Sequence, residues 1–193
     1  MNTMEIRSFS TELRAADAMK IGGIAVPWDT FSENLPGFRE RFTRGAFSET
    51  LASSQDVLLL WSHNRSMPLA SRASNTLQIR DDPAGLAFDA SLNSTSWARD
   101  AHAAIAAGTV RTCSFLFDVP AGGDTWVKEN GTLVRTVHRA RLFEISPTCM
   151  AAYPATAVGV RSIAEVLAGA ETQGVIMRDL LAESIALEIE RSR

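Results

Sequence analysis

Short apolar segments separated by turn residues run through the first 160 residues of this chain, and this pattern limits its fold more than any other feature. The sequences at 81–85 (DDPAG) and 130–131 (NG) are typical of turns, and each lies between two such segments, which predicts two β-hairpins. About seven short strands in a chain of this length indicate a closed or nearly closed antiparallel sheet. We therefore expect a β-rich (α+β) fold. The expected strands include 4–9, 19–28, 57–61, 86–92, 110–119 and 134–146.

Three other segments have helical spacing or composition. The Ala-rich stretch 97–107 follows the capping sequence NSTS and ends before Gly108, which suits a left-handed C-terminal cap, so we expect a helix there. Apolar residues near helical spacing predict a shorter helix at 40–51. The spacing is helical again at the C-terminus. We divide the chain into one domain, 1–161, and a helical segment, 162–193, which either packs on that domain or is an appended docking or assembly segment.

Composition argues against several functions. Hydrophobic residues are 46% and charged residues 21%, as in an ordinary globular protein, and no Lys/Arg cluster offers the basic face that nucleic acids need. The two cysteines are too few for a disulfide framework or a zinc site. No window approaches the roughly 18 apolar residues of a membrane span, and the N-terminus lacks the apolar core of a signal peptide. We therefore expect an intracellular protein with no nucleic-acid or membrane partner.

His63 stands out among the three histidines because it comes just after the apolar run 57–61. That run is expected to be a strand buried on both faces, and reactive side chains are often placed where such strands end. His102, in contrast, lies in the Ala-rich helix with no carboxylate at a useful spacing, which favours an exposed residue without a chemical role. His63 is therefore the candidate general base.

A serine nucleophile is expected in the segment 110–119, where residues alternate between two faces of a strand. Cys113, Phe115 and Phe117 share one face and mark the core side. Ser114 then points to the opposite face and is the candidate nucleophile. The weaker alternative makes Cys113 or Cys149 the nucleophile, and Cys113 faces the core side, where a buried thiol in apolar surroundings is normally inert.

A third group that orients the imidazole is expected in the strand 134–146, where His138 and Glu144 share one face. They are about 20 Å apart at roughly 3.3 Å per residue, so only one of them can reach the site. An uninterrupted hairpin ladder would place Ser114 opposite Pro147. About three unpaired residues before the hairpin would bring Glu144 opposite Ser114, whereas about nine would be needed for His138. This register favours Glu144 and leaves His138 as the alternative.

Four sequence elements are informative as an ordered set. A histidine follows a buried strand in LLLWSHN, and a serine lies in a short strand after the Ala-rich helix in GTVRTCSFLF. An L-x-E-I-S motif followed by Pro, Ala and Tyr occurs in LFEISPTCMAAYPAT, and an early element occurs in FRERFTRGAFSETL. In this order the elements resemble the phage prohead (capsid maturation) proteases of the HK97 type, over positions 21 to 161.

The resemblance implies a herpesvirus-protease-like antiparallel β-barrel with two or three peripheral helices, and serine endopeptidase activity. Residue by residue, it assigns the histidine to His63, the serine to Ser114 and the acidic third member to Glu144. In the related herpesvirus enzymes the third member is a histidine, which keeps His138 open. Candidate donors for the oxyanion are Arg111, Arg141 and the backbone N–H groups after Ser146.

The resemblance also implies partners and a place of action. Such proteases act inside the immature capsid, in the host bacterial cytoplasm. They cut the scaffold protein or the scaffolding arm of the major capsid protein, and often themselves. No metal or cofactor is called for, and a homodimer is open by analogy with the herpesvirus enzymes. The competing hypothesis is a catalytically inactive β-barrel that serves as a scaffold or capsid-assembly interaction protein.

Overall fold

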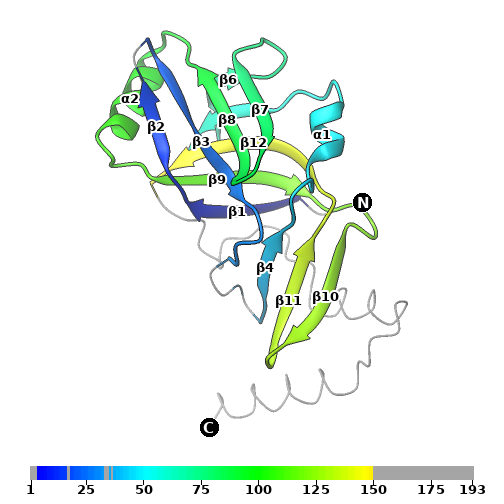
Figure 1. Cartoon of the computed structure of the whole chain (residues 1–193). Coiled ribbons are helices and arrows are strands. Elements are labelled where there is room, and N and C mark those ends of the chain that lie inside the picture. The colour runs from blue at the N-terminus through cyan, green and yellow to red at the C-terminus, as the bar shows by residue number, and fades with distance from the viewer. Residues whose placement is uncertain (1–3, 17, 33–34, 36, 150–193) are drawn as a thin grey trace. The chain divides into compact units, whose positions relative to one another are not determined.

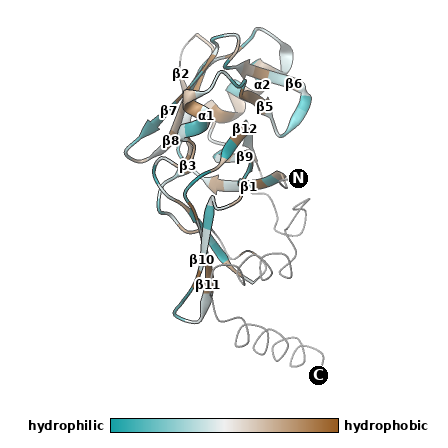
Figure 2. Ribbon diagram, turned by 90° about the vertical axis from the view of Figure 1, so that its right-hand side faces the viewer, coloured by the Kyte–Doolittle hydropathy of each residue, from teal (hydrophilic) through white to brown (hydrophobic). Residues whose placement is uncertain are grey.

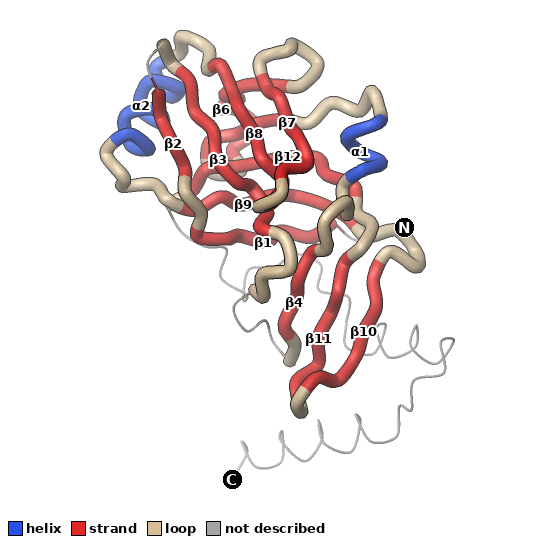
Figure 3. The backbone as a smooth tube through the Cα atoms, viewed as in Figure 1, coloured by secondary structure: helices blue, strands red, loops and turns tan. Residues whose placement is uncertain are grey.

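The structure, a computed structural model, describes residues 4–16, 18–32, 35 and 37–149. Within these residues the chain forms twelve strands and two helices, and strands dominate (Figure 3). The expected β-rich (α+β) class is confirmed. The helical segment expected at 162–193 and the proposed domain boundary at 161 lie outside the described residues.

Five strands make the sheet that carries the candidate site residues, in the order β1-β9-β12-β5-β6 (Figure 1). Neighbouring strands are antiparallel except β12 and β5, which run parallel. The bounds are Met4–Ser10 for β1, Thr112–Asp118 for β9, Arg141–Thr148 for β12, Leu58–Trp61 for β5 and Asn64–Ser71 for β6. The apolar run before His63 is therefore a strand with a partner on each side, as its composition indicates.

Two further sheets contain the remaining strands. One is antiparallel in the order β2-β3-β8-β7, with bounds Leu13–Ala16, Lys20–Pro27, Gly85–Ser91 and Leu77–Asp82. The other has the order β10-β11-β4, with bounds Asp124–Glu129, Thr132–Val137 and Arg39–Phe42, and its β11 and β4 are parallel.

The structure differs from the closed antiparallel barrel that the resemblance implied. None of the three sheets in the described part of the chain closes on itself, and two of the strand pairings are parallel. The physical reason is that the hairpin β10–β11 leaves the ladder formed by β9 and β12 and pairs with β4. The fold is thus a set of open sheets around a shared core.

The core joins the two larger sheets, because one hydrophobic cluster contains residues from both. Its centre is aromatic: the ring of Phe42 contacts the rings of Phe47, Phe115 and Phe117 at centroid distances of 5.8, 5.4 and 5.2 Å. None of these four side chains is more than 1% exposed. Full burial of a side chain of this kind stabilises a fold by roughly 1.5–3 kcal/mol. This cluster decides which face of β9 points inward.

Helix α2 (Ser96–Ala106) agrees with the segment expected from the sequence. Gly108 follows it with a φ of +70°, which is the left-handed conformation predicted for its cap. Among the described residues, no helix is long and apolar enough to cross a membrane.

The prediction of a helix at 40–51 is wrong for the first half of this segment. β4 ends at Phe42, and α1 (Ser48–Ala52) is only a short helix after a turn. Gly45 has a φ of +83° in that turn, a conformation that glycine adopts without steric cost. Phe42 and Phe47 both reach the core, which gives the sequence an apolar spacing like that of a helix.

The hairpin β10–β11 extends away from the two larger sheets (Figure 2). Asn130 and Gly131 form its turn with φ of +49° and +84°, which is the left-handed pair that an Asn-Gly hairpin predicts. The single long strand expected at 134–146 is interrupted, since β11 ends at Val137 and β12 begins at Arg141. The interruption arises because the chain leaves one sheet and enters another at this point.

Candidate active site

Strand β9 presents Ser114 on the face opposite to the core. Cys113, Phe115 and Phe117 are fully buried in the hydrophobic cluster, as the alternation predicts. Ser114 lies on the other face, between β1 and its register partner on β12, Ser146. It nevertheless has no exposed surface.

Glu144 lies on β12, two residues before Ser146 and on the same face. Its register partner is Leu116, so Glu144 is displaced along the ladder from Ser114 and does not lie opposite it. The register expected from the sequence is therefore wrong. Two connecting segments separate the β9–β12 ladder from the hairpin, and the ladder is irregular between Leu142 and Glu144. Counting residues from the hairpin turn therefore does not predict which residues of β9 and β12 pair.

His63 occupies the turn that joins β5 to β6. Ser62 and His63 have φ of +51° and +61°, the left-handed pair of a tight hairpin turn. Each non-glycine residue in this region costs on the order of 1 kcal/mol or more, and such strain is frequent at functional sites. The N–H of Ser62 donates to the carbonyl of Pro147 at 3.2 Å, and the N–H of His63 donates to Oγ of Ser146 at 3.1 Å. These two bonds hold the turn against β12.

The three candidate residues form one hydrogen-bonded chain. Nδ1 of His63 is 2.6 Å from Oε1 of Glu144, and Nε2 of His63 is 2.6 Å from Oγ of Ser114. A carboxylate can only accept hydrogen bonds, so we place the imidazole proton on Nδ1, which leaves Nε2 to accept the proton of Ser114. In this tautomer the imidazole can act as a base toward the serine hydroxyl.

The surroundings of Glu144 favour its ionised form. Burial of this carboxyl opposes ionisation, but hydrogen bonds from His63 and Ser146 favour the carboxylate and outweigh the effect of burial. The positive charge of Arg65, an exposed residue on β6, acts in the same direction. The pKa of Glu144 is therefore lowered from its ordinary value, and the group is a carboxylate at neutral pH.

The hydroxyl of Ser114 has a second acceptor on the neighbouring strand. Its Oγ donates to the backbone carbonyl of Arg7 on β1 at 2.9 Å. A hydroxyl has one proton, so Ser114 donates fully either to Arg7 or to Nε2 of His63. Only the second arrangement hands the proton to the base, so the Arg7 carbonyl competes with the imidazole for it.

The other residues considered from the sequence have different surroundings. His138 lies between β11 and β12, is exposed, and places its Nε2 3.1 Å from the carbonyl of Gly122. Arg141 donates to both carboxylate oxygens of Asp118 at 2.8 and 2.5 Å, so its guanidinium is already paired. Arg111 is exposed just before β9.

Two alternative chemistries have little support in the described residues. The thiol of Cys113 faces the core, and burial raises its pKa well above the usual range, because an ionised thiolate would lose its hydration there. In the segments that the structure describes, no group of three or more His, Cys, Asp or Glu side chains could hold a metal ion. The hydroxyl of Ser114, in contrast, is hydrogen-bonded to the imidazole of His63.

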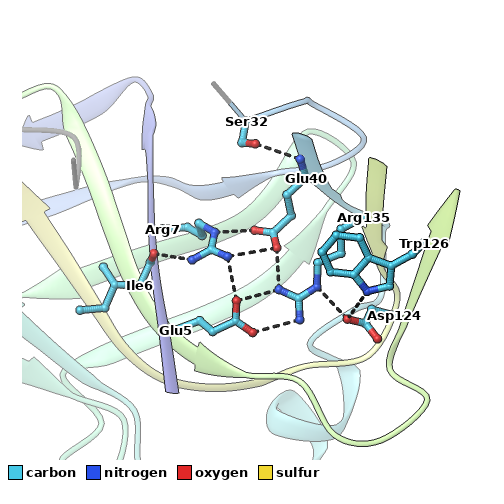
Figure 4. A network of polar contacts seen from close by, with 8 residues as sticks. All are labelled: Glu5, Ile6, Arg7, Ser32, Glu40, Asp124, Trp126 and Arg135. Atoms are coloured by element: carbon cyan, nitrogen blue, oxygen red, sulfur yellow. Dashed lines mark hydrogen bonds and ion pairs between the residues drawn. The ribbon is translucent and has the colours of Figure 1, made fainter. Parts of the chain in front are cut away.

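A buried cluster of charged side chains holds β1 beside the site (Figure 4). Arg135 on β11 donates to both oxygens of Glu5 at 2.7 and 2.9 Å. It also pairs with Glu40 and Asp124 at 2.8 and 2.7 Å, while Arg7 pairs with Glu5 and Glu40 at 2.7 and 2.8 Å. None of the five residues is more than 9% exposed. The cluster joins the three-stranded sheet to β1, whose backbone contacts the candidate nucleophile.

Sequence analysis missed two contributors to this site, Ser146 and the backbone carbonyl of Arg7. Ser146 has the same strand parity as Glu144, and that signal could have placed it on the site face. Pro147 follows Ser146 and has no N–H, so the first backbone donor expected after Ser146 does not exist. The contact of Arg7 depends on a long-range pairing of β1 with β9 and leaves no local signal.

A serine, an imidazole and a carboxylate that are hydrogen-bonded in this order are characteristic of serine hydrolases. The family model of caudovirus prohead serine proteases matches residues 4–168. The chain belongs to this family, as the ordered sequence elements indicated, and the family acts as proteases in phage capsid maturation. Comparison with curated proteins gave no match, and comparison with solved structures gave none either.

Proposed function

We propose that this chain is a serine endopeptidase in which Ser114 is the nucleophile, His63 the general base and acid, and Glu144 the carboxylate that orients the imidazole. The observation that carries the proposal is the continuous chain from Ser114 Oγ through both ring nitrogens of His63 to Glu144, with 2.6 Å at each link. Membership in a serine protease family supports the same reaction class.

In the acylation step, Oγ of Ser114 attacks the carbonyl carbon of a peptide bond while its proton moves to Nε2 of His63. Glu144 stays ionised and stabilises the imidazolium that forms. His63 then gives the proton to the departing amine, the C–N bond breaks, and an acyl-enzyme remains.

In the deacylation step, water attacks the acyl carbon with His63 as the base, and the serine oxygen leaves with the proton that His63 returns. Both steps pass through a tetrahedral oxyanion. Each backbone or side-chain donor that meets this oxyanion contributes roughly 3–4 kcal/mol to transition-state stabilisation. The route uses no metal or cofactor.

The proposed substrates are the scaffold protein or the scaffolding arm of the major capsid protein, cut inside the immature capsid in the host bacterial cytoplasm. The role of the family in capsid maturation supports this substrate class. We also propose self-cleavage that removes the segment 162–193, and a homodimer by analogy with the herpesvirus enzymes.

Co-expression with the major capsid protein of the same phage tests the proposal. We expect the native chain to shorten the capsid protein and the Ser114→Ala variant to leave it intact, with equal thermal stability of both chains. A fluorophosphonate probe should label the native chain and spare the variant. Shortening by the folded Ser114→Ala variant would overturn the assignment of the nucleophile. Absence of both labelling and shortening with the native chain would support the inactive interaction protein instead.

Mass spectrometry of the purified chain tests self-cleavage separately. We expect the active protein to lose mass that corresponds to part or all of 162–193, and the Ser114→Ala variant to keep its full mass of 20.9 kDa. An intact C-terminus in an active preparation would contradict self-cleavage and leave the protease assignment in place.

A further inference from the structure

We propose that Ser146 is a positioning residue of this site, which holds the imidazole and the carboxylate in their relative places through one hydroxyl group. The inference rests on the proposed function and deepens it by adding a fourth side chain to the three named above. Ser146 is not assigned a contact with substrate or with the reacting atoms.

Two hydrogen bonds define the position of the Ser146 hydroxyl. Its Oγ accepts the backbone N–H of His63 at 3.1 Å and donates to Oε1 of Glu144 at 2.5 Å. The direction of both bonds is determined, because an N–H group can only donate and a carboxylate can only accept. Ser146 is fully buried, so water does not replace either partner.

Oε1 of Glu144 is the oxygen that Nδ1 of His63 also approaches, at 2.6 Å. The hydroxyl and the imidazole therefore converge on one carboxylate oxygen from two directions. Ser146 thus determines where this oxygen lies relative to the ring, and a hydrogen bond to an ionised acceptor is stronger than one between neutral groups.

The second bond of Ser146 acts on the backbone of His63. This residue has a φ of +61° in a turn that a non-glycine residue adopts only at a cost. The N–H bond to Ser146 fixes the peptide group next to the ring, and the ring reaches Ser114 only from this turn. One hydroxyl therefore constrains both ends of the bond between His63 and Glu144.

Ser32 offers a matched control outside the site. It is buried, and its Oγ accepts a backbone N–H, that of Glu40, at 2.9 Å. Ser32→Ala removes the same kind of bond from the backbone of Glu40, and it takes no partner from the Glu40 carboxylate, which pairs with Arg7 and Arg135 in Figure 4. A loss of activity that comes only from weakening the fold should then appear in both variants, whereas a loss that comes from positioning should appear only in Ser146→Ala.

Steady-state cleavage of a peptide or protein substrate tests the inference. For Ser146→Ala we expect kcat to fall by about 10- to 100-fold with little change in KM, the range typical when a hydrogen-bond partner that orients a metal-binding histidine is removed. Ser146→Thr keeps a hydroxyl and should recover most of kcat.

A kcat of Ser146→Ala equal to that of the native chain, or an equal loss in Ser32→Ala, would overturn the inference. If Ser146→Ala does not fold, Ser146→Thr and Ser146→Cys decide the question, since Thr should keep activity and Cys, a weak donor, should lose it. Equal activity of these two would also count against the inference.

A spectroscopic readout separates this inference from the proposed function. In Ser114→Ala protein, the Nδ1 proton of His63 should give a low-field NMR signal, and adding Ser146→Ala should shift or remove it. A signal that does not change contradicts positioning even in a chain with no activity. Absence of labelling and cleavage with the native chain contradicts the proposed function, whatever the signal does.

Discussion

Ser114 lies directly opposite Ser146 on the neighbouring strand, and the candidate carboxylate is two pairs further along the ladder. The three candidate residues therefore do not meet through strand pairing alone. They meet because the turn after β5 places His63 over β12, where its two ring nitrogens reach in different directions to Ser114 and Glu144. The geometry of this turn is thus as important to the site as the two strands are.

Glu144→Gln should lower kcat by about 10⁴ while the chain stays folded. The amide keeps the volume of the side chain but removes its charge, and its N–H₂ group favours the wrong tautomer of His63. A loss on the order of 10⁴ is what the equivalent change causes in a protease triad. The measurement is kcat with a purified substrate, together with circular dichroism to verify folding. Activity within tenfold of the native chain would exclude an orienting role for Glu144.

His138→Ala should keep activity within about twofold of the native chain. Both ring nitrogens of His63 already have partners, and the ring of His138 is exposed and contacts the carbonyl of Gly122 instead. An exposed substitution away from buried features changes stability by roughly 0.5 kcal/mol or less. The same cleavage assay checks this. An inactive but folded His138→Ala would mean that the third member of the site is the histidine of the herpesvirus pattern.

The parts of this structure that follow from neighbouring residues could be predicted. The alternation in β9 identifies the core face through Phe115 and Phe117, and the Asn-Gly turn and α2 depend on contacts within a few residues. His63 was a candidate for the same reason, since it follows a strand whose apolar run is visible in the sequence.

The parts that depend on where distant segments pair could not be predicted. The register of β9 with β12 depends on the hairpin between them joining β4, which no local signal reveals. Glu5 and Arg7 alternate with apolar or small residues and resemble an exposed strand face, yet they are buried against Glu40 and Arg135. The spacing of Phe42, Phe47 and the other apolar residues of this segment is near that of a helix. The spacing arises because both phenylalanine side chains reach one core, although Phe42 itself lies in a strand.

The contribution of Glu144 to stability should depend on pH. Its pKa is lowered in the folded state, because the hydrogen bonds from His63 and Ser146 outweigh its burial. A lowered pKa stabilises the folded chain above the ordinary value of about 4.5, and this stabilisation is lost as the pH falls through the folded value. The difference in Tm between the native chain and Glu144→Gln should therefore be largest near pH 7 and shrink below pH 4.5. A difference that stays constant from pH 7 to pH 3 would contradict the lowered pKa.

Iodoacetamide should distinguish the two cysteines in the native chain. Cys149 is exposed and should be alkylated, whereas Cys113 is buried with a raised pKa and should react only after unfolding in urea. Peptide mass analysis locates the modified residue, and cleavage activity should persist after Cys149 is blocked. Alkylation of Cys113 in the folded protein, with loss of activity, would favour a cysteine nucleophile over Ser114.

Arg135→Met should destabilise the chain by roughly 3–5 kcal/mol, which is typical when one partner of a buried ion cluster is removed. Met keeps the apolar volume of the side chain, but Glu5, Glu40 and Asp124 lose their shared cation in a buried environment. For a domain of this size the expected loss in Tm is about 10 °C. Thermal and urea unfolding measure the effect.

Arg80→Met is the matched control for this prediction. Arg80 pairs with Asp89, but both side chains are about half exposed, at 50% and 54%, so water solvates the carboxylate when its partner is removed. The expected cost is below about 1 kcal/mol. Arg135→Met should also lower activity more than Arg80→Met does, because Arg135 holds Glu5 on β1, the strand that borders Ser114. Equal stability of the two variants would mean that the cluster contributes no more than an ordinary surface pair, and equal activity would mean that the position of β1 does not affect the site.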